Sequence, residues 1–429
     1  MRIHLKTLGC RLNEAEMETW SRDFLDRGHE ITQNLDEADL IVVNTCAVTG
    51  EAVRKSRKLL NRAQRQNPCS KLVVSGCFAS LNPDEDTQSL GVDLIVDNRD
   101  KDRLVEITTR ELNLHVMPEQ ATAPGESNLL SRGRQRAFIK VQDGCRYQCT
   151  FCIVTVARGE ERSRPADQVI AEINLMADQG IQEIVLTGVH LGGYGSDNGS
   201  DLSQLIRAIL QQTTIPRVRL GAVEPWDIPD SFWELFQNHR LMPHLHLPIQ
   251  SGSDALLKRM ARRCKTAEFT RLVSQARSTV ADLNLTTDII VGFPGETEKE
   301  WQQTIDYVEE IGFSHLHIFA YSPRPGTRAA MLPDPVTRDA IRRRSEQLHQ
   351  IGKKLKRDFL SRYIGREFPV LIESAPLDPS LGWNGYTPNF LRVEINHPTK
   401  EDLENRIVSV RLQQLSDSGD AITAILLDE

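Results

Sequence analysis

Apolar residues follow two patterns along the chain: short continuous runs typical of buried strands, and longer stretches with the three-to-four spacing of amphipathic helices. Within residues 1–125, three runs rich in branched apolar residues alternate with helical stretches. They are RIHLKTLGC (2–10), DLIVVNTC (39–46) and KLVVSGC (71–77). Because continuous apolar strands separated by helices indicate a parallel sheet, we expect an N-terminal α/β domain over residues 1–120.

The middle of the chain repeats one strand–helix unit six times. Residues 115–135 precede it and, being polar with Pro, Gly and Ser, are typical of a linker. Strand candidates then begin at residues 136, 183, 218, 244, 285 and 315, with amphipathic stretches between them. Repeated βα units predict a (β/α) barrel, and six units in place of eight predict an open one, which we place at residues 131–360. Each strand leads into polar or glycine-rich residues at its carboxyl end, where barrel active sites lie.

Short β-like runs at residues 368–374, 390–396, 405–415 and 421–429 predict a small all-β barrel over residues 362–429. Tyr386 and Phe390 belong to this region and either pack in its core or stack on nucleic-acid bases. The predicted fold class is therefore α/β: a parallel N-terminal domain, a partial (β/α)6 barrel and a C-terminal all-β barrel.

Charge is distributed unevenly in this chain of 429 residues, whose formal net charge is −7. The total argues against simple charge-driven binding to nucleic acid, but residues 340–367 carry nine basic side chains against three acids. Five of them are our candidates for contacts with RNA phosphates: Arg342, Arg343, Lys353, Lys354 and Arg357. A second basic patch comprises Arg54, Lys55, Arg57, Lys58, Arg62 and Arg65. For either patch, a solvated helix face is the alternative.

No apolar run approaches the roughly 20 residues of a membrane span, and the N-terminus shows no signal-peptide pattern. We therefore expect a cytoplasmic protein without a membrane partner. Eight cysteines in such a chain suit metal ligation better than a disulfide scaffold.

Cys145, Cys149 and Cys152 lie within the eight-residue stretch CRYQCTFC. Its CxxxCxxC spacing is too tight for several unstrained disulfides but suits three thiolates around one iron–sulfur cube. Since a [4Fe–4S] cluster ordinarily takes four ligands, one iron would remain open to a small molecule. The alternatives are a zinc site or a group of buried cysteines.

Cys10, Cys46 and Cys77 each end one of the three N-terminal strand candidates, although they are 36 and 31 residues apart. The carboxyl ends of parallel strands meet at one edge of a sheet, so these cysteines are predicted to form a second three-thiolate site. Cys69 and Cys264 have no such partners and are interpreted as structural or incidental.

The CxxxCxxC motif and the loops that follow resemble those of radical S-adenosylmethionine (SAM) enzymes, in which the amino and carboxylate groups of SAM chelate the open iron. The resemblance assigns residues of these loops to SAM binding. Thr187, Gly188, Gly192 and Gly193 would contact the methionine end, Gln250, Ser251 and Ser253 the ribose, and Asp288 and Gly292 the adenine.

Over essentially its whole length the chain is similar to the methylthiotransferases, a radical SAM family with two [4Fe–4S] clusters and a C-terminal RNA-binding TRAM module. The segment LGCRLN (8–13) resembles the branch that inserts sulfur and a methyl group at C2 of N6-threonylcarbamoyladenosine, position 37 beside the tRNA anticodon. The residues Val154-Thr155-Val156 depart from the Ile-Pro commoner in the family. The resemblance implies tRNA (its anticodon stem-loop), a one-electron reductant and a sulfur donor as partners.

Two other substrates and two other classes of protein remain as alternatives. Isopentenyladenosine in tRNA or an aspartate of a ribosomal protein are the substrates of the other methylthiotransferase branches. An iron–sulfur redox sensor explains six cysteines but not the loops that resemble adenosine-binding segments. A cobalamin-dependent radical methyltransferase would normally carry an Asp-x-His-x-x-Gly motif, which residues 1–125 lack.

Overall fold

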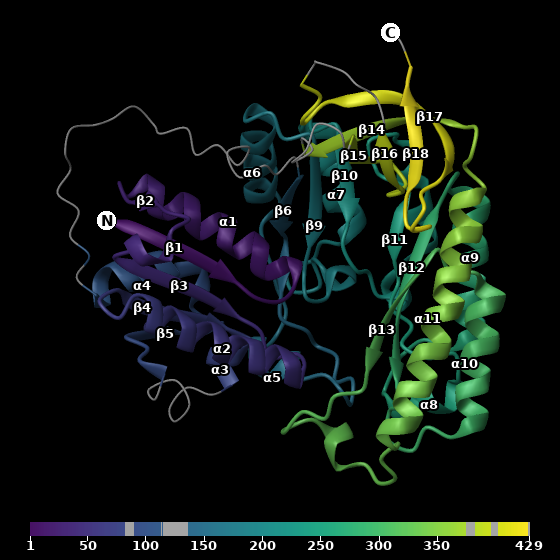
Figure 1. Ribbon diagram of the computed structural model, residues 1–429, viewed down its shortest axis with the longest axis horizontal. Helices are drawn as coiled ribbons and strands as arrows, with labels where there is room; N and C mark the ends of the chain where they lie inside the picture. Colours follow the sequence, from purple (N-terminus) through teal and green to yellow (C-terminus); the bar gives the residue numbers. More distant parts are fainter. Residues whose placement is uncertain (82–89, 113, 115–135, 375–381, 396–401, 428–429) are drawn as a thin grey trace.

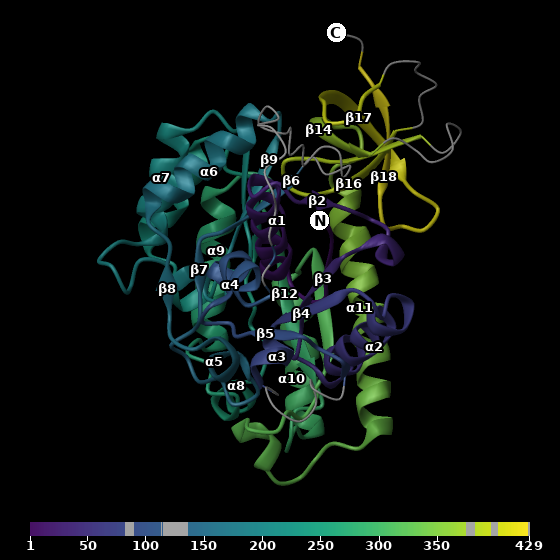
Figure 2. The same ribbon diagram turned by 90° about the vertical axis from the view of Figure 1, so that its left-hand side faces the viewer.

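The computed structural model describes residues 1–81, 90–112, 114, 136–374, 382–395 and 402–427 (Figure 1). An N-terminal α/β layer lies beside an open barrel of parallel strands, and a small all-β barrel covers one end of the open barrel (Figures 1 and 2). The predicted linker (115–135) and the domain limits at residues 120 and 131 lie outside the described residues. Within the described part of the chain, no helix has both the length and the apolar character needed to cross a membrane.

The N-terminal sheet contains five parallel strands in the order β2-β1-β3-β4-β5. The strands are β1 (Arg2–Thr7), β2 (Glu30–Ile31), β3 (Leu40–Thr45), β4 (Lys71–Gly76) and β5 (Leu94–Val96). The helices are α1 (Arg11–Asp26), α2 (Gly50–Gln66), α3 (Cys77–Leu81) and α4 (Leu104–Glu111). Successive residues of β3 face opposite sides: Val42 packs with α1 and α4, whereas Ile41 and Val43 pack with α2 and α3. Both faces of the sheet are therefore covered, which explains its continuous apolar runs.

Six parallel strands form the open barrel, in the orders β10-β9-β6 and β11-β12-β13. They are β6 (Arg136–Lys140), β9 (Glu183–Thr187), β10 (Arg217–Leu220), β11 (His244–His246), β12 (Asn284–Val291) and β13 (His315–Ala320). Single bridges, Val218 to Leu241 and Ala222 to His246, connect the two halves. Among the described residues β6 and β13 are not paired with each other, so the predicted open six-stranded barrel is confirmed.

Helices cover the outside of this barrel: α6 (Ala166–Asp178), α7 (Leu202–Gln212), α8 (Asp254–Arg259), α9 (Thr266–Thr279) and α10 (Glu298–Ile311). Outward strand residues such as Ile139, Leu186 and Leu285 join them in one hydrophobic core. Helix α10 begins at a capping box, in which the Thr297 hydroxyl accepts a hydrogen bond from the Glu300 backbone N–H at 3.3 Å.

The inner face of the barrel carries both polar and apolar side chains and lines a cavity of about 1040 Å³. The inward residues alternate with the apolar outward ones and include Arg136, Thr187, Arg219, His244, His246, Asn284, Thr286, Asp288, His315 and His317. A packed (β/α)8 barrel fills this space with layers of branched apolar residues. This barrel instead encloses a cavity into which several charged and polar side chains point.

Helix α11 (Arg338–Ser361), which the Thr337 hydroxyl caps by accepting a hydrogen bond from the Ala340 N–H, leads to the C-terminal barrel. Its strands are β14 (Glu367–Ser374), β15 (Trp383–Tyr386), β16 (Arg392–Ile395), β17 (Ile407–Leu415) and β18 (Ile422–Leu426). They close in the order β14-β15-β16-β18-β17, so the predicted all-β barrel is confirmed. Strand β15 was not predicted, because Asn384 and Gly385 interrupt its apolar pattern.

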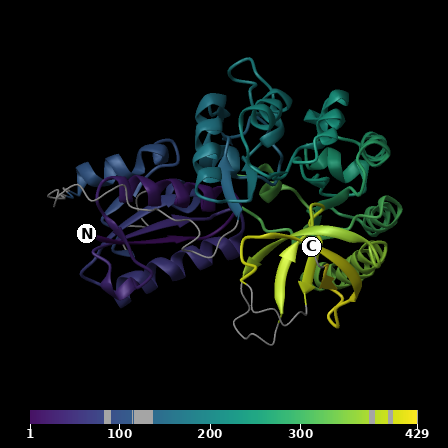
Figure 3. The same cartoon turned by 90° about the horizontal axis from the view of Figure 1, so that it is seen from above.

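The C-terminal barrel sits against the amino ends of the parallel strands (Figure 3). The Arg217 guanidinium donates to the backbone oxygens of Tyr386 (3.0 Å) and Pro369 (2.8 Å), and the Asn284 amide donates to that of Asn389 (2.7 Å). Arg217 and Asn284 are the first residues of β10 and β12. The C-terminal barrel therefore closes the end of the cavity opposite to the carboxyl ends of the strands.

Candidate active site

Residues 145–152 form a loop that a two-stranded hairpin closes at the carboxyl end of β6. Strand β7 (Gln142–Asp143) pairs antiparallel with β8 (Arg162–Ser163), and α5 (Val154–Arg158) lies between them. The Thr150 N–H donates to the Met260 carbonyl oxygen at 3.0 Å, which attaches the loop to the segment after β11. The Arg262 guanidinium lies 3.7 Å from the Cys149 Sγ and also donates to the Pro248 carbonyl oxygen. The cysteine loop thus lies on the same barrel face as the segments after β11.

Cys145, Cys149 and Cys152 are all free thiols. Burial raises the pKa of the Cys145 thiol to about 12 and that of Cys152 to about 11, and the neighbouring cysteines add to both shifts. Such thiols become thiolates when a metal cation replaces the proton. Three closely spaced thiols without a disulfide fit an iron–sulfur cluster that takes its fourth ligand from outside the protein.

The structure brings together Cys10, Cys46 and Cys77 at the carboxyl edge of the N-terminal sheet. Thr7 is in register with Asn44, and Thr45 with Gly76, so the cysteines that follow leave adjacent strands at one level. Burial raises the pKa of Cys46 to about 11, and the neighbouring Cys77 and Cys10 raise it further. These three thiols are likewise free, and they fit a second cluster in the same way.

Two glycines allow this convergence. Gly9 has a φ of +122° and Gly76 a φ of +96°, a region in which other residues are strained. A Cβ at Gly9 would lie 2.8 Å from the Cβ of Cys46, and a Cβ at Gly76 would lie 2.3 Å from the backbone oxygen of Thr45. Each glycine thus precedes a cysteine of the set and lets its strand end approach the neighbouring strand.

The predicted SAM-binding residues lie in different surroundings. Thr187, Gly188 and Asp288 line the central cavity, where the Asp288 carboxylate is 3.1 Å from the His246 Nε2. Gly192 and Gly193 lie in a short 3-10 helix, Leu191–Gly193, packed against Asp227 and His190.

The hydroxyls of Ser251 and Ser253 are hydrogen-bonded to α10: Ser251 to Thr304 at 3.1 Å and Ser253 to Gln303 at 2.7 Å. In this structure, these two hydroxyls are therefore used within the protein and do not line the cavity. Gln250, with a φ of +81°, donates its backbone N–H to the Asp288 carbonyl oxygen at 2.9 Å. Gly292 lies against the Ile341 side chain of α11.

A group of acids around His190 was not anticipated from the sequence. The His190 ring is bonded to Glu161 through Nδ1 and to Asp227 through Nε2 (2.6 Å). Burial disfavours the charged ring, but the bond to Asp227, the charge of Glu224 and the bond to Glu161 together raise the pKa of His190. Glu224 and Asp227 come from the segment VEPWD (223–227), which begins three residues after the end of β10, so their place at a strand end was the available signal.

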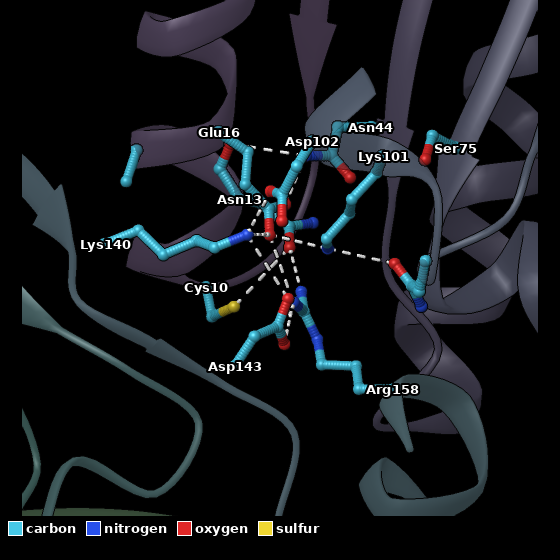
Figure 4. Close-up of polar contacts among 12 residues, drawn as sticks. Cys10, Asn13, Glu16, Asn44, Ser75, Lys101, Asp102, Lys140, Asp143 and Arg158 are labelled. Atoms are coloured by element: carbon cyan, nitrogen blue, oxygen red, sulfur yellow. Dashed lines mark hydrogen bonds and ion pairs between the residues drawn. The ribbon is translucent and has the colours of Figure 1, made fainter. Parts of the chain in front are cut away.

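Beside Cys10 lies a buried network of charges (Figure 4). Glu16 of α1 is 2.5 Å from the Lys101 ammonium and 3.1 Å from the Arg158 guanidinium. Asp143 of β7 is 3.0 Å from Arg158 and 3.3 Å from Lys140. All five side chains are buried, and they join the N-terminal domain to the barrel.

Arg158 connects this network to both cysteine sets. It ends α5, which begins two residues after Cys152, and its guanidinium donates to the Asn13 Oδ1 at 2.9 Å. That oxygen is 3.6 Å from the Cys10 Sγ, and the Asn13 amide donates to the Leu8 and Thr45 carbonyl oxygens. One buried side chain thus positions the loop of the first set against the strand ends of the second.

The five basic residues proposed for RNA binding are all exposed on α11. At about 100° per residue, Arg342, Arg343, Lys353, Lys354 and Arg357 fall within about 120° of arc. Arg344, from the same run, is buried and its guanidinium pairs with Glu296 at 2.8 Å, so it belongs to the fold. Tyr386 and Phe390 stack on each other (4.6 Å between ring centres) and line the cavity. The basic residues of the second patch are exposed on α2.

Comparison with known proteins assigns the chain to a family. Residues 2–97 match the model of the uncharacterized protein family UPF0004, and residues 139–308 match the radical SAM superfamily. A curated relative from Thermotoga maritima, a threonylcarbamoyladenosine tRNA methylthiotransferase, is 36% identical over 97% of this chain and 95% of its own. This chain belongs to the radical SAM methylthiotransferase family. Another methylthiotransferase relative, from Nitratidesulfovibrio vulgaris, is a tRNA-2-methylthio-N(6)-dimethylallyladenosine synthase, 33% identical over 96% of this chain and 93% of its own.

The fold of this methylthiotransferase is shared with a radical SAM methyltransferase, TsrM, from Kitasatospora setae. The TM-score is 0.59 at 15% identity, covering 77% of this chain and 75% of that one. TsrM has also been solved with cobalamin and a [4Fe–4S] cluster, whereas residues 1–125 of this methylthiotransferase contain no Asp-x-His-x-x-Gly motif.

Proposed function

We propose that this methylthiotransferase replaces the hydrogen at C2 of N6-threonylcarbamoyladenosine in tRNA, at the position beside the anticodon, with a methylthio group. The observation that carries the proposal is the shared cavity: Cys10 of one cysteine set opens onto the same space as Thr187, Gly188 and Asp288. A base placed there would face Cys10, and Val154, two residues after Cys152, lines the same cavity. The Thermotoga maritima relative, named for this nucleoside and aligned over nearly the whole chain, supports the choice of substrate.

The cofactors of this family are two [4Fe–4S] clusters and SAM. We assign Cys145, Cys149 and Cys152 to the cluster that binds SAM, because their loop lies on the barrel face with Gln250 and the segment after β12. We assign Cys10, Cys46 and Cys77 to the second cluster, beside which the sulfur is delivered. With SAM bound, the first cluster supplies a radical able to remove hydrogen from an unactivated carbon.

The chain itself has to hold the base and keep the two cysteine sets apart at a fixed distance. The buried network around Arg158 suits the second task, because it is satisfied from both domains. The cavity suits the first: its lining includes the polar side chains of Asp288 and His317, which offer hydrogen bonds to a base that has left the RNA stack.

For the tRNA itself, the exposed basic face of α11 and the adjoining C-terminal barrel, which we interpret as a TRAM-like module, offer the surface. A one-electron reductant and a sulfur donor complete the set of partners, and the cytoplasm, where tRNA is modified, is the expected location.

The test is the nucleoside product. Protein reconstituted anaerobically with iron and sulfide is incubated with SAM, a reductant and three substrates in parallel: threonylcarbamoylated tRNA, isopentenylated tRNA and ribosomal protein. We expect 2-methylthio-N6-threonylcarbamoyladenosine by mass spectrometry of digested tRNA. Modification of either other substrate in place of the threonylcarbamoylated tRNA would overturn the proposal, and so would SAM cleavage with no modified product in any of the three.

A further inference from the structure

Arg11 directly follows Cys10 and is the first residue of α1, and both residues line the central cavity. Its guanidinium carbon lies 4.8 Å from the centre of the Phe138 ring. Stacking on a ring occupies the flat face of a guanidinium, while its N–H donors lie in the plane and stay available. The side chain is therefore held in place without using its hydrogen-bond donors.

Among the described residues, Arg11 differs from the other lysines and arginines of the cavity in forming no ion pair, although the more distant charges of Glu14 and Glu373 act on it. In the described part of the chain, Arg136 pairs with Glu183 and Glu373, Arg219 with Glu183, Lys356 with Asp420, and Arg392 with Glu394. For Arg11 the same residues provide neither an ion pair nor a hydrogen bond to its side chain. An arginine that faces a cavity with its fork of donors unused is suited to a planar anion such as a carboxylate.

The proposed substrate carries such an anion in a suitable place, and the inference here rests on that proposed function. The threonylcarbamoyl group on N6 ends in the carboxylate of threonine. In adenine C2 and C6 both flank N1, so a substituent on N6 extends along the same edge of the base as the reacting carbon. If C2 approaches the cluster site of Cys10, Cys46 and Cys77 to receive sulfur, the carboxylate of the substituent comes to the side of the cavity where Arg11 lies.

We propose that Arg11 binds the carboxylate of the threonylcarbamoyl group and thereby makes the site selective for an acidic modified adenosine. The paired cations of the cavity are already neutralised, so among the lysines and arginines of the described lining Arg11 is the one whose charge is left for the substrate. A neutral N6 substituent such as isopentenyl would gain nothing from this contact. Arg11 is on this view a specificity-determining residue, and it takes no part in the radical step.

The test compares two anticodon stem-loop RNAs that differ in one group: one carries N6-threonylcarbamoyladenosine, the other the same nucleoside with its carboxylate converted to a primary amide. Dissociation constants are measured by fluorescence anisotropy at fixed salt for wild-type protein, Arg11→Gln and Arg11→Lys. Arg392→Gln is the matched control, because it removes a cavity-lining cation that is already paired with Glu394. Because both RNAs carry the same phosphates, loss of a general attraction to RNA cancels in the acid-to-amide ratio.

Wild-type protein should bind the acid RNA roughly 10- to 100-fold more tightly than the amide RNA, the range expected for a charge-assisted hydrogen bond. The preference should vanish in Arg11→Gln, persist in Arg392→Gln and survive in part in Arg11→Lys, which keeps the charge without the fork. A wild-type ratio near one, or a preference unchanged in Arg11→Gln, overturns the proposal. If Arg11→Gln binds neither RNA, Arg11→Lys decides, and a ratio near one in that variant overturns it.

The proposed function is tested separately by the activity of reconstituted wild-type protein on the acid RNA. Methylthiolation of that RNA together with a binding ratio near one would refute the carboxylate subsite and leave the function standing. Absence of methylthiolation would refute the function itself, and the substrate selectivity inferred for Arg11 with it.

Discussion

Replacing Glu16 by glutamine should remove most of the stability that the buried network contributes. Burial on its own would raise the pKa of Glu16, but the charges of Lys101, Arg158 and Lys140 outweigh it and lower the pKa from 4.5 to about 2. A depressed carboxylate pKa stabilises the folded state at every pH above the unfolded value. The stabilisation is lost as the pH falls from 4.5 towards 2.

The size of the effect follows from that shift. At about 1.4 kcal/mol per pKa unit, lowering the pKa of Glu16 from 4.5 to about 2 corresponds to about 3 kcal/mol at pH 7. Breaking a buried ion pair by removing one partner typically costs about 3–5 kcal/mol, which agrees. Since glutamine imitates the protonated acid, the difference between wild-type protein and Glu16→Gln should fall to about half at pH 3.

Urea unfolding of the cluster-free proteins, followed by circular dichroism at pH 7, 4 and 3, measures the difference directly. The matched control is Glu106→Gln, which removes an exposed acid paired with Arg103 on the surface of α4 and should change little at any pH. If the gap between wild-type protein and Glu16→Gln were as large at pH 3 as at pH 7, or absent at pH 7, the role assigned to this carboxylate would be wrong.

Three further predictions concern the clusters and the RNA. Changing Cys145, Cys149 and Cys152 to alanine should lower bound iron from about eight to about four atoms and abolish SAM cleavage. Changing Cys10, Cys46 and Cys77 to alanine should also halve the bound iron but leave SAM cleavage intact. Full iron content in either variant would contradict the assignment. Gly76→Ala should displace Cys77 and lose the second cluster's iron, while Gly199→Ala, whose Cβ would meet open space, should keep it. Replacing Lys353, Lys354 and Arg357 by glutamine should reduce the slope of log Kd for tRNA against log salt concentration by about 2–3. The control is Arg366→Gln, because Arg366 is already paired with Asp282. An unchanged slope in the triple variant would exclude α11 from phosphate contact.

Much of the architecture was predictable because burial on both faces makes parallel strands into continuous apolar runs. The three N-terminal runs that end at Cys10, Cys46 and Cys77 became neighbouring strands, and their register explains why distant cysteines meet. The side chains that point into the barrel also left a pattern in the sequence. In HLH (244–246) and HLHIFA (315–320) every second residue is a histidine or a phenylalanine, and these residues line the cavity.

Contacts between distant segments were not predictable from local pattern. Glu16 and Arg158 are 142 residues apart, and nothing around either residue indicates that they meet. For the same reason the sequence places Arg344 in a basic run on a helix face, and nothing in that run indicates that this arginine is buried against Glu296. The two-residue β2 and three-residue β5 are too short for periodicity to reveal, and the hydroxyls of Ser251 and Ser253 turn to α10 because Gln303 and Thr304 offer partners there.

The open side of the barrel has a consequence for self-association. Strand β6 lies at the edge of its sheet, and the backbone N–H of Phe138 donates to the Glu18 carboxylate of α1 at 3.4 Å. Ala15 of the same helix packs against Phe138 and Val185. An uncovered edge strand can pair with a strand of another chain, and here α1 covers the edge of β6. The N-terminal domain therefore also protects the barrel from joining edge to edge with a second copy, and a barrel deprived of it would be prone to aggregate.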